Sequence, residues 1–203
     1  MKFISTSKAK LVLSDGTVFE GFSLGVKGIT TGEMCFNTGM TGYQEIYTDP
    51  SYKGQIIINT TSHIGNYGIK NGEEESNNVQ FSGLVCNTFS NIFSRFQSEY
   101  ALNNYFLDNN IIGISGVDTR KLVRYIRSKG SMNGIISNDN LDENYLKNKL
   151  LEVPSMHGLE LSSTVSTKNE YFFGNPDAKF KLAVLDLGIK KNILRNFEQR
   201  DCF

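Results

Sequence analysis

The first part of the chain carries short apolar runs of residues that favour β-strands. Residues 10–13 and 17–22 form two such runs, joined by Asp15 and Gly16. Asp-Gly pairs fit the tight turns between antiparallel strands, so we predict a β-hairpin here. Residues 30–37 predict a further strand. Residues 55–61 predict one that is buried, because residues 56–58 form a continuous apolar run.

The middle of the chain adds helices to this pattern. Residues 119–129 predict the clearest one, since Leu122, Val123 and Ile126 form an apolar stripe at helical spacing. Asp118 precedes this segment as a helix cap, its last turn is basic, and a glycine follows as a stop. We also expect a helix over residues 99–107, with Ser98 as its cap, and another over residues 141–151. Further strands are expected over residues 79–87, 111–114 and 133–137.

Strands alone at the front and alternating strands and helices in the middle predict a mixed α/β domain. We expect two β layers with helices on one side, a layered β/β/α arrangement, over residues 1–153. Residues 154–178 are polar and rich in turn residues, which is typical of a linker. Residues 181–187 then predict a buried strand of the parallel type, followed by a helix over residues 189–200. A doubly wound domain needs several such units, so residues 179–203 predict only the start of one.

A polar stretch rich in amide and aromatic side chains occupies residues 32–55. Thr41 and Gln44 have the spacing of a capping box and predict one short helical turn. The Asp-Pro pair before Ser51 favours a tight turn, which puts Ser51 at the tip of a loop. Its hydroxyl can either cap this turn or face a ligand, and the residues themselves leave both interpretations open.

Composition excludes several classes of function. The 203 residues carry 21 lysines and arginines against 21 aspartates and glutamates, so no overall field attracts nucleic acid or an anionic membrane. No apolar run approaches the roughly 20 residues that span a bilayer, and the N-terminus does not resemble a secretory signal. The acidic run Glu73, Glu74 and Glu75 predicts an exposed, solvated loop. We expect a cytoplasmic protein.

Few residues offer chemistry of their own. Cys35, Cys86 and Cys202 are too widely spaced for a disulfide framework or a metal site, and the first two fit small core residues in strands. None has the flanking glycines of a nucleophile on a sharp turn. Residues 21–25 match Gly-x-Ser-x-Gly but lack the helix that must follow this hydrolase motif. Because the two histidines have no ligand spacing and no phosphate-binding glycine motif occurs, we expect no metal, cofactor or catalytic residue in this chain.

Five segments resemble, in the same order, the small, glutamine-hydrolysing subunit of carbamoyl-phosphate synthetase, and the resemblance covers nearly the whole chain. One departure concerns the loop before residue 63, where members of that family often carry a proline and this chain has Thr60, Thr61 and Ser62. The segments are GEMCFNTGMTGYQEIYTDPSYKGQI at residues 32–56, HIGNYG at 63–68, GISGVDTRKLVRYIRSKG at 113–130, MNGII at 132–136 and LDLGIKKNILR at 185–195.

The resemblance implies a function for the whole subunit. It implies that glutamine is hydrolysed to glutamate and ammonia, and that ammonia passes to a large subunit. That partner would hold ATP and Mg and make carbamoyl phosphate from bicarbonate, for arginine and pyrimidine synthesis. Residues 1–153 would dock on the large subunit, and residues 179–203 would begin a class I glutamine amidotransferase domain.

The resemblance also assigns one site residue. The glutamine-contacting serine of the family falls on Ser51, as a substrate-binding and not a catalytic residue. The catalytic Cys, His and Glu of the family fall beyond Phe203. We therefore expect the chain to be a fragment of the small subunit that is inactive alone.

A non-catalytic function also fits these residues. In this alternative, the chain binds a protein partner through residues 38–51 and performs no chemistry. Asp118 and Arg120 likewise allow two interpretations. They can be a helix cap with a surface arginine, or a contact with another subunit, since arginine is frequent at interfaces.

Overall fold

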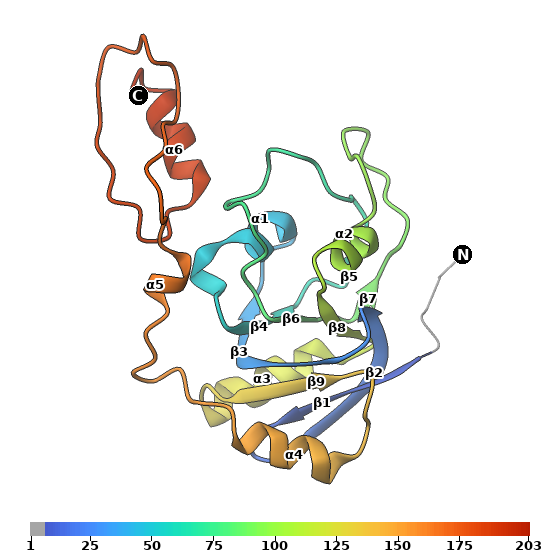
Figure 1. Cartoon of the computed structure of the whole chain (residues 1–203). Helices are drawn as coiled ribbons and strands as arrows, with labels where there is room; N and C mark the ends of the chain where they lie inside the picture. The colour runs from blue at the N-terminus through green and yellow to red at the C-terminus, as the bar shows by residue number, and fades with distance from the viewer. Residues whose placement is uncertain (1–6) are drawn as a thin grey trace.

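Seven strands of the computed structural model form one closed barrel, and the structure describes residues 7–203 (Figure 1). The order around the barrel is β1-β2-β8-β6-β4-β3-β9. Strands β3, β4, β6 and β8 are parallel to their neighbours within this group, and the other pairings are antiparallel. The strands are β1 Lys8–Leu13, β2 Val18–Gly25, β3 Ile29–Asn37, β4 Gln55–Asn59, β6 Gly83–Val85, β8 Ile112–Ser115 and β9 Asn133–Ser137.

The predicted hairpin is confirmed as β1 and β2, which pair antiparallel with Leu11 opposite Phe19. The strands expected over residues 30–37, 55–61, 111–114 and 133–137 appear as β3, β4, β8 and β9. The strand expected over residues 79–87 is much shorter and keeps only β6. Two further strands, β5 His63–Ile64 and β7 Thr88–Phe89, pair with each other in a small parallel sheet.

Alternation along the strands divides the core into clusters on the two faces of the barrel wall. In β4, Ile56 and Ile58 belong to one cluster together with Leu11, whereas Ile57 belongs to another. This period of two is the ordinary consequence of strand geometry. Helix α3, Thr119–Lys129, adds Leu122 to the first cluster. The second cluster lies under α1 Tyr43–Thr48 and α2 Leu102–Asp108, and a third, smaller one lies under α4 Glu143–Leu151.

The expected mixed α/β class is confirmed, but the layered β/β/α arrangement is not. Strand β9 pairs with both β1 and β3, so the sheet closes on itself and does not stack as two open layers. Closure leaves no unpaired sheet edge in the barrel. The helices then pack on different sides of the barrel wall and not on one side (Figure 1).

Two helix predictions have different outcomes. Helix α3 has the predicted limits, since the Asp118 carboxylate accepts a hydrogen bond from Lys121 N at 2.9 Å and Gly130 follows with φ of 98°. Helix α2 begins later than expected, and its cap is Ala101, so the prediction of a Ser98 cap is wrong. The Ser98 hydroxyl donates instead to the carbonyl oxygen of Tyr67.

The strand predicted over residues 181–187 is absent from the described part of the chain. Phe180 makes a single parallel bridge with Cys202, the N–H of Leu182 donates to the Phe203 carbonyl oxygen at 2.8 Å, and no strand in residues 7–203 pairs with residues 183–187. Buried strands need such partners for their N–H and C=O groups. Leu185 and Leu187 are consequently 83% and 60% exposed. The helix predicted after this segment is present as α6, Lys191–Glu198, and a short helix α5, Ser162–Val165, lies between it and the barrel (Figure 1).

Candidate functional site

Ser51 lies on an exposed turn between α1 and β4. Residues Pro50–Tyr52 form one turn of 3-10 helix, and Asp49 Oδ1 accepts a hydrogen bond from the Ser51 N–H at 2.9 Å. The carboxylate of Asp49 thus performs the capping that one interpretation gave to the serine. Within residues 7–203, the Ser51 hydroxyl makes no hydrogen bond. Its backbone is fixed and its side chain is free to face a ligand.

The same aspartate links this turn to the C-terminal part of the chain. Asp49 Oδ2 lies 2.6 Å from Lys190 Nζ, and the Asp49 side chain is only 8% exposed. Hydrogen bonding to this carboxylate raises the pKa of Lys190 above its ordinary value. Gly188 lies beside Pro50, because a Cβ atom built on Gly188 would be 3.4 Å from Pro50 Cβ. The Ser51 turn and residues 188–190 are therefore neighbours.

Glu75 makes a second link between the barrel and α6. It is 8% exposed, so the prediction of a solvated acidic loop is wrong at this residue. Glu75 Oε2 accepts a hydrogen bond from Asn192 N at 2.9 Å, and Glu75 O accepts one from Lys191 N at 2.9 Å. Carboxylates stabilise helix N-termini because they satisfy unpaired N–H groups and oppose the helix dipole. A residue 117 positions away thus caps α6.

The neighbours of Glu75 strengthen this contact. Arg195 donates to the carbonyl oxygens of Gly72 and Glu74 at 2.8 and 2.9 Å and lies 3.9 Å from the Glu75 carboxylate. Lys191 Nζ lies 3.4 Å from Glu74 Oε1. Glu73, in contrast, pairs with Arg95 within the barrel part of the chain. The acidic run is therefore a docking element for α6.

Tyr67 anchors the polar stretch that precedes Ser51. Its hydroxyl oxygen accepts hydrogen bonds from Gly42 N at 2.6 Å and Tyr43 N at 2.8 Å, at the start of α1. No side chain of the stretch itself caps this helix, so the capping box predicted from Thr41 and Gln44 is wrong. The Gln44 side chain instead exchanges two hydrogen bonds with the backbone of Lys70. Two motifs that are distant in sequence thus form one structural unit.

The thiols in the barrel are poor nucleophiles. Cys86 is completely buried, and burial raises the pKa of its thiol well above the ordinary value. Burial also raises the pKa of the half-buried Cys35. Since the thiolate is the reactive form, both cysteines behave as the small core residues that the sequence predicts.

Other candidates for chemistry are also accounted for. Ser23 of the Gly-x-Ser-x-Gly match lies inside β2, where its hydroxyl oxygen accepts a hydrogen bond from Asn138 Nδ2 at 2.7 Å. Within residues 7–203, no group of three or more His, Cys, Asp or Glu side chains could hold a metal ion. No helix in the same range is long and apolar enough to cross a membrane.

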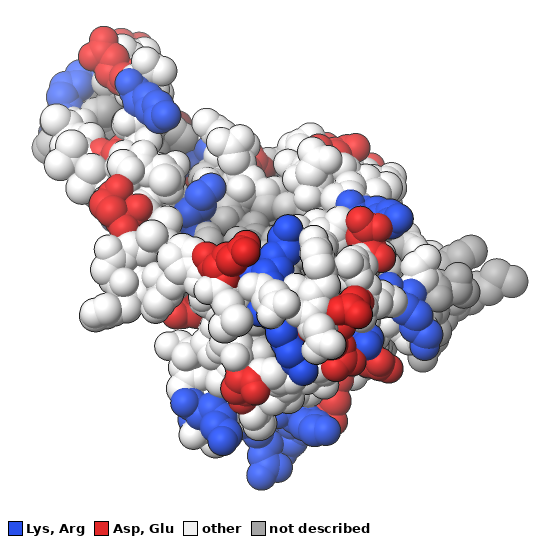
Figure 2. All heavy atoms as spheres, turned by 60° about the horizontal axis from the view of Figure 1, so that its bottom comes forward, with Lys and Arg blue, Asp and Glu red and all other residues white. Residues whose placement is uncertain are grey.

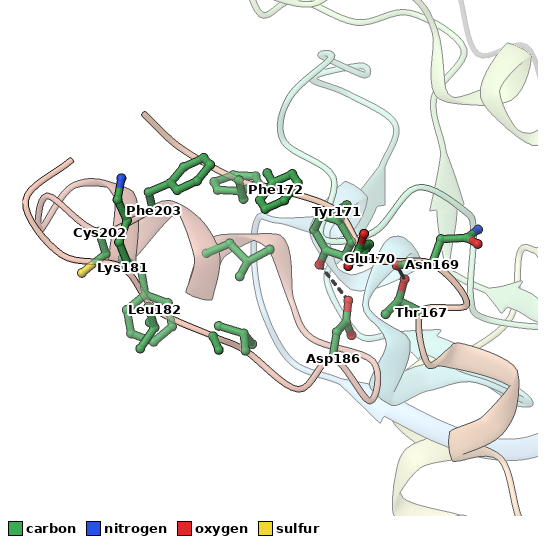
Figure 3. Close-up of a pocket in the computed structure, with 15 residues that line it drawn as sticks. Thr167, Asn169, Glu170, Tyr171, Phe172, Lys181, Leu182, Asp186, Cys202 and Phe203 are labelled. Atoms are coloured by element: carbon green, nitrogen blue, oxygen red, sulfur yellow. Dashed lines mark hydrogen bonds between the residues drawn. The ribbon is translucent and has the colours of Figure 1, made fainter. Parts of the chain in front are cut away.

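The C-terminal part of the chain contains a cavity of about 620 Å³ that does not include Ser51. Its walls are mostly apolar, with Phe172 stacked on Phe203 and with Leu182 elsewhere in the lining (Figure 3). The Tyr171 hydroxyl donates to Asp186 at 2.7 Å at one end of this cavity. The segment at 181–187, which did not form a strand, makes one wall, and residues 167–173, α6 and the last residues of the chain make the others.

Sequence reasoning predicted the turn at Ser51 but missed the contacts that hold this turn against the rest of the fold. The contact of Asp49 with Lys190 and the contacts of Tyr67 and Glu75 involve partners that are far away in the chain, which no local pattern reveals. One signal was available for Glu75. The basic residues of the segment at 185–195 complement in charge the acidic run at 73–75, and this complementarity predicts a contact between them.

Known proteins are similar to this chain over most of its length. The sequence pattern described as "Carbamoyl-phosphate synthase small chain, CPSase domain" matches residues 11–136. The carbamoyl phosphate synthase small chain of Vibrio cholerae is 45% identical over an alignment 213 residues long. This alignment includes 97% of this chain and 56% of that protein. The protein of the same name from Aquifex aeolicus is 44% identical over 199 residues, covering 92% of this chain and 54% of that protein. The chain spans about half the length of these relatives, and it belongs to the family of carbamoyl-phosphate synthase small chains.

Proposed function

We propose that this chain is the N-terminal part of a small subunit that hydrolyses glutamine and supplies ammonia to a large subunit. In this proposal, the large subunit holds ATP and Mg and makes carbamoyl phosphate from bicarbonate. Family membership supports the proposal, and so does the length of the relatives, which leaves room for a catalytic Cys, His and Glu outside these 203 residues. Residues 1–203 alone do not hydrolyse glutamine, because burial raises the pKa of both barrel thiols and none of the three cysteines has the flanking glycines of a nucleophile on a sharp turn.

Ser51 contributes to the glutamine site in this proposal. The observation that carries the assignment is an exposed hydroxyl without a hydrogen bond in residues 7–203, on a turn whose backbone Asp49 fixes. A hydroxyl so placed can donate to the carboxylate of glutamine or accept from its ammonium group. It loses little conformational entropy on binding, because the turn is already ordered. Its role is to orient the substrate and not to attack it.

The division of the chain follows from the same proposal. Residues 1–153 form the unit that docks on the large subunit, residues 154–178 form a linker, and residues 179–203 begin an amidotransferase domain. The exposure of Leu185 and Leu187 supports this last assignment, since a strand of a doubly wound sheet buries such side chains against its neighbours. The subunit works in the cytoplasm.

The test is the Ser51→Ala variant in the complete small subunit with its large subunit. We expect the KM for glutamine to rise with a smaller loss in kcat, because one hydrogen bond to a charged group contributes about 1.5–3 kcal/mol. That corresponds to roughly a ten- to hundredfold loss in specificity constant. Carbamoyl phosphate synthesis from free ammonia should be unchanged. Ser155→Ala, another exposed serine outside the turn, is the matched control.

Two outcomes would contradict the proposal. Unchanged glutamine kinetics in Ser51→Ala would remove Ser51 from the substrate site. A complete small subunit without glutamine hydrolysis would instead favour the alternative of a non-catalytic module that binds a partner through residues 38–51.

A further inference from the structure

Helix α3 is unusual for a protein whose charges balance. Over the face drawn in Figure 2, acidic and basic side chains are interspersed. The sequence of α3, in contrast, contains five cations and no acidic residue. These cations are Arg120, Lys121, Arg124, Arg127 and Lys129.

Three of these cations share one face of the helix. Arg120, Arg124 and Arg127 are separated by four and three residues, which places them on adjacent turns of the same side. All three are exposed. With Thr38, Thr60 and Val123 they line a groove of about 610 Å³, which we name the arginine groove.

The three guanidinium groups have no anionic partner within residues 7–203. Arg95 and Arg195 elsewhere in the protein both lie within 4 Å of carboxylates, but no ion pair or hydrogen bond satisfies the arginines of the groove. Like charges three or four residues apart destabilise a helix by about 0.2–0.5 kcal/mol per pair. Such an arrangement costs stability in the free chain, and an external anion would relieve it.

The groove lies at the C-terminal ends of β3 and β4. Thr38 and Thr60 directly follow the last residues of the parallel strands β3 and β4. The last residue of β3, Asn37, donates from its amide to the Tyr52 hydroxyl at 3.1 Å, and Tyr52 ends the turn that carries Ser51. The backbone of that turn leads into Gln55, at the opposite end of β4, so the groove is linked to the Ser51 turn through the Tyr52 side chain.

The dimensions of the groove favour a protein segment over a single small anion. Arg120 and Arg127 are seven residues apart, which separates their Cα atoms by about 10 Å along the helix axis. Successive carboxylates on one side of an extended chain lie about 7 Å apart and can each engage one guanidinium group. Met40, two residues from Thr38, is 83% exposed. Arginine and methionine are both enriched at protein–protein interfaces.

We propose that the arginine groove docks an acidic segment of the large subunit, an inference that rests on the proposed function. The guanidinium groups attract the segment and form bidentate hydrogen bonds with its carboxylates. The docked segment also compensates the repulsion along α3.

The test compares two charge reversals in the complete small subunit. Arg124→Glu/Arg127→Glu changes the groove, whereas Lys147→Glu/Lys149→Glu on α4 makes the same change in net charge elsewhere. Association with the purified large subunit is followed by biolayer interferometry at low and high salt. The groove variant should associate about 10- to 1,000-fold more slowly at low salt, with a smaller difference at high salt, and the control should not. The melting temperature of the groove variant should change little, because the substitution at Arg124 turns its repulsion with Arg120 into attraction, while the two new glutamates repel each other as the two arginines did.

Equal association rates for the two variants and the wild type would overturn the inference. It would also be wrong if the groove variant lost binding of inorganic phosphate but still associated at the wild-type rate, since the groove would then hold a small anion. Glutamine hydrolysis by each isolated small subunit is measured in parallel. A wild-type subunit without that activity overturns the proposed enzymatic function, while the association rates still decide the docking surface. A wild-type subunit that does not associate with the large subunit overturns both.

Discussion

Removal of the Glu75 carboxylate should release α6 from the barrel without unfolding the barrel. In Glu75→Ala, the N–H of Asn192 loses its acceptor and Arg195 loses its nearest carboxylate. The backbone hydrogen bond from Lys191 N to Glu75 O does not depend on the side chain and remains. The substitution therefore tests one side-chain link between two parts of the chain.

The expected magnitude follows from these contacts. Loss of a helix cap costs about 0.5–2 kcal/mol, and a hydrogen bond to a charged acceptor contributes about 1.5–3 kcal/mol. These two figures describe the same hydrogen bond and are not added. The pair with Arg195 spans 3.9 Å, and the Arg195 side chain is 27% exposed, so we assign it less than about 1 kcal/mol. A total of about 2–3 kcal/mol corresponds to a 30- to 150-fold rise in the opening equilibrium of α6.

Hydrogen exchange measured by mass spectrometry provides the assay, because it reports local opening peptide by peptide. Amides of α6 should exchange faster in Glu75→Ala by the factor given above, while those of β4 keep the wild-type rate. Glu74→Ala is the matched control, since the Glu74 side chain is 28% exposed and pairs with Lys191 at 3.4 Å. Its effect should stay below about 1 kcal/mol.

Two results would refute this reasoning. If both variants accelerated exchange in α6 equally, the buried carboxylate would have no special role in docking. If Glu75→Ala accelerated exchange in β4 as much as in α6, the residue would stabilise the barrel itself and not the link to α6.

Two further predictions concern titratable groups. Asp49→Asn should lower the free energy of unfolding near neutral pH, because the raised pKa of Lys190 means that the folded state binds its proton more tightly. This stabilisation is complete below the ordinary lysine pKa of 10.5 and is lost as the pH rises through the raised pKa. Denaturant titrations of the wild type and the variant should therefore give converging free energies of unfolding above that pH. A difference in free energy that stays constant with pH would contradict this prediction. Cys86 should resist N-ethylmaleimide in the folded protein and react after denaturation, and rapid labelling of the native protein would show that the burial is wrong.

Local patterns in the sequence were sufficient to predict those parts of the structure that depend on neighbouring residues in the chain. The β1–β2 turn, the limits of α3 and the positions of most strands all follow from alternation and from residues such as Asp118. The capping predictions failed where a distant residue competed. Tyr67 supplies the acceptor at α1 that Thr41 was expected to supply, and Ser98 bonds to Tyr67 and not to a helix N-terminus.

The sequence could not show that the barrel closes, or that residues 181–187 form no strand. Both depend on which strands are neighbours in space. Alternation in β9 is compatible with an open sheet, and only its pairing with both β1 and β3 makes the barrel. The apolar residues 181–187 have the composition of a buried strand, but composition does not supply the neighbouring strands on which that structure depends. For the site, the turn and the exposure of Ser51 follow from local residues, whereas its support by Asp49 and Lys190 required the fold.

The pairing of β1 with β9 has a consequence for synthesis of the protein. Lys10 lies opposite Ser137 in this register, so the barrel cannot close until residue 137 has left the ribosome. Until then, the edges of β1 and β3 that await β9 stay unpaired and can pair with other chains. Contacts of such long sequence separation also slow folding, because loop closure must precede them. Nascent chains that stop before β9 should therefore depend on chaperones to remain soluble.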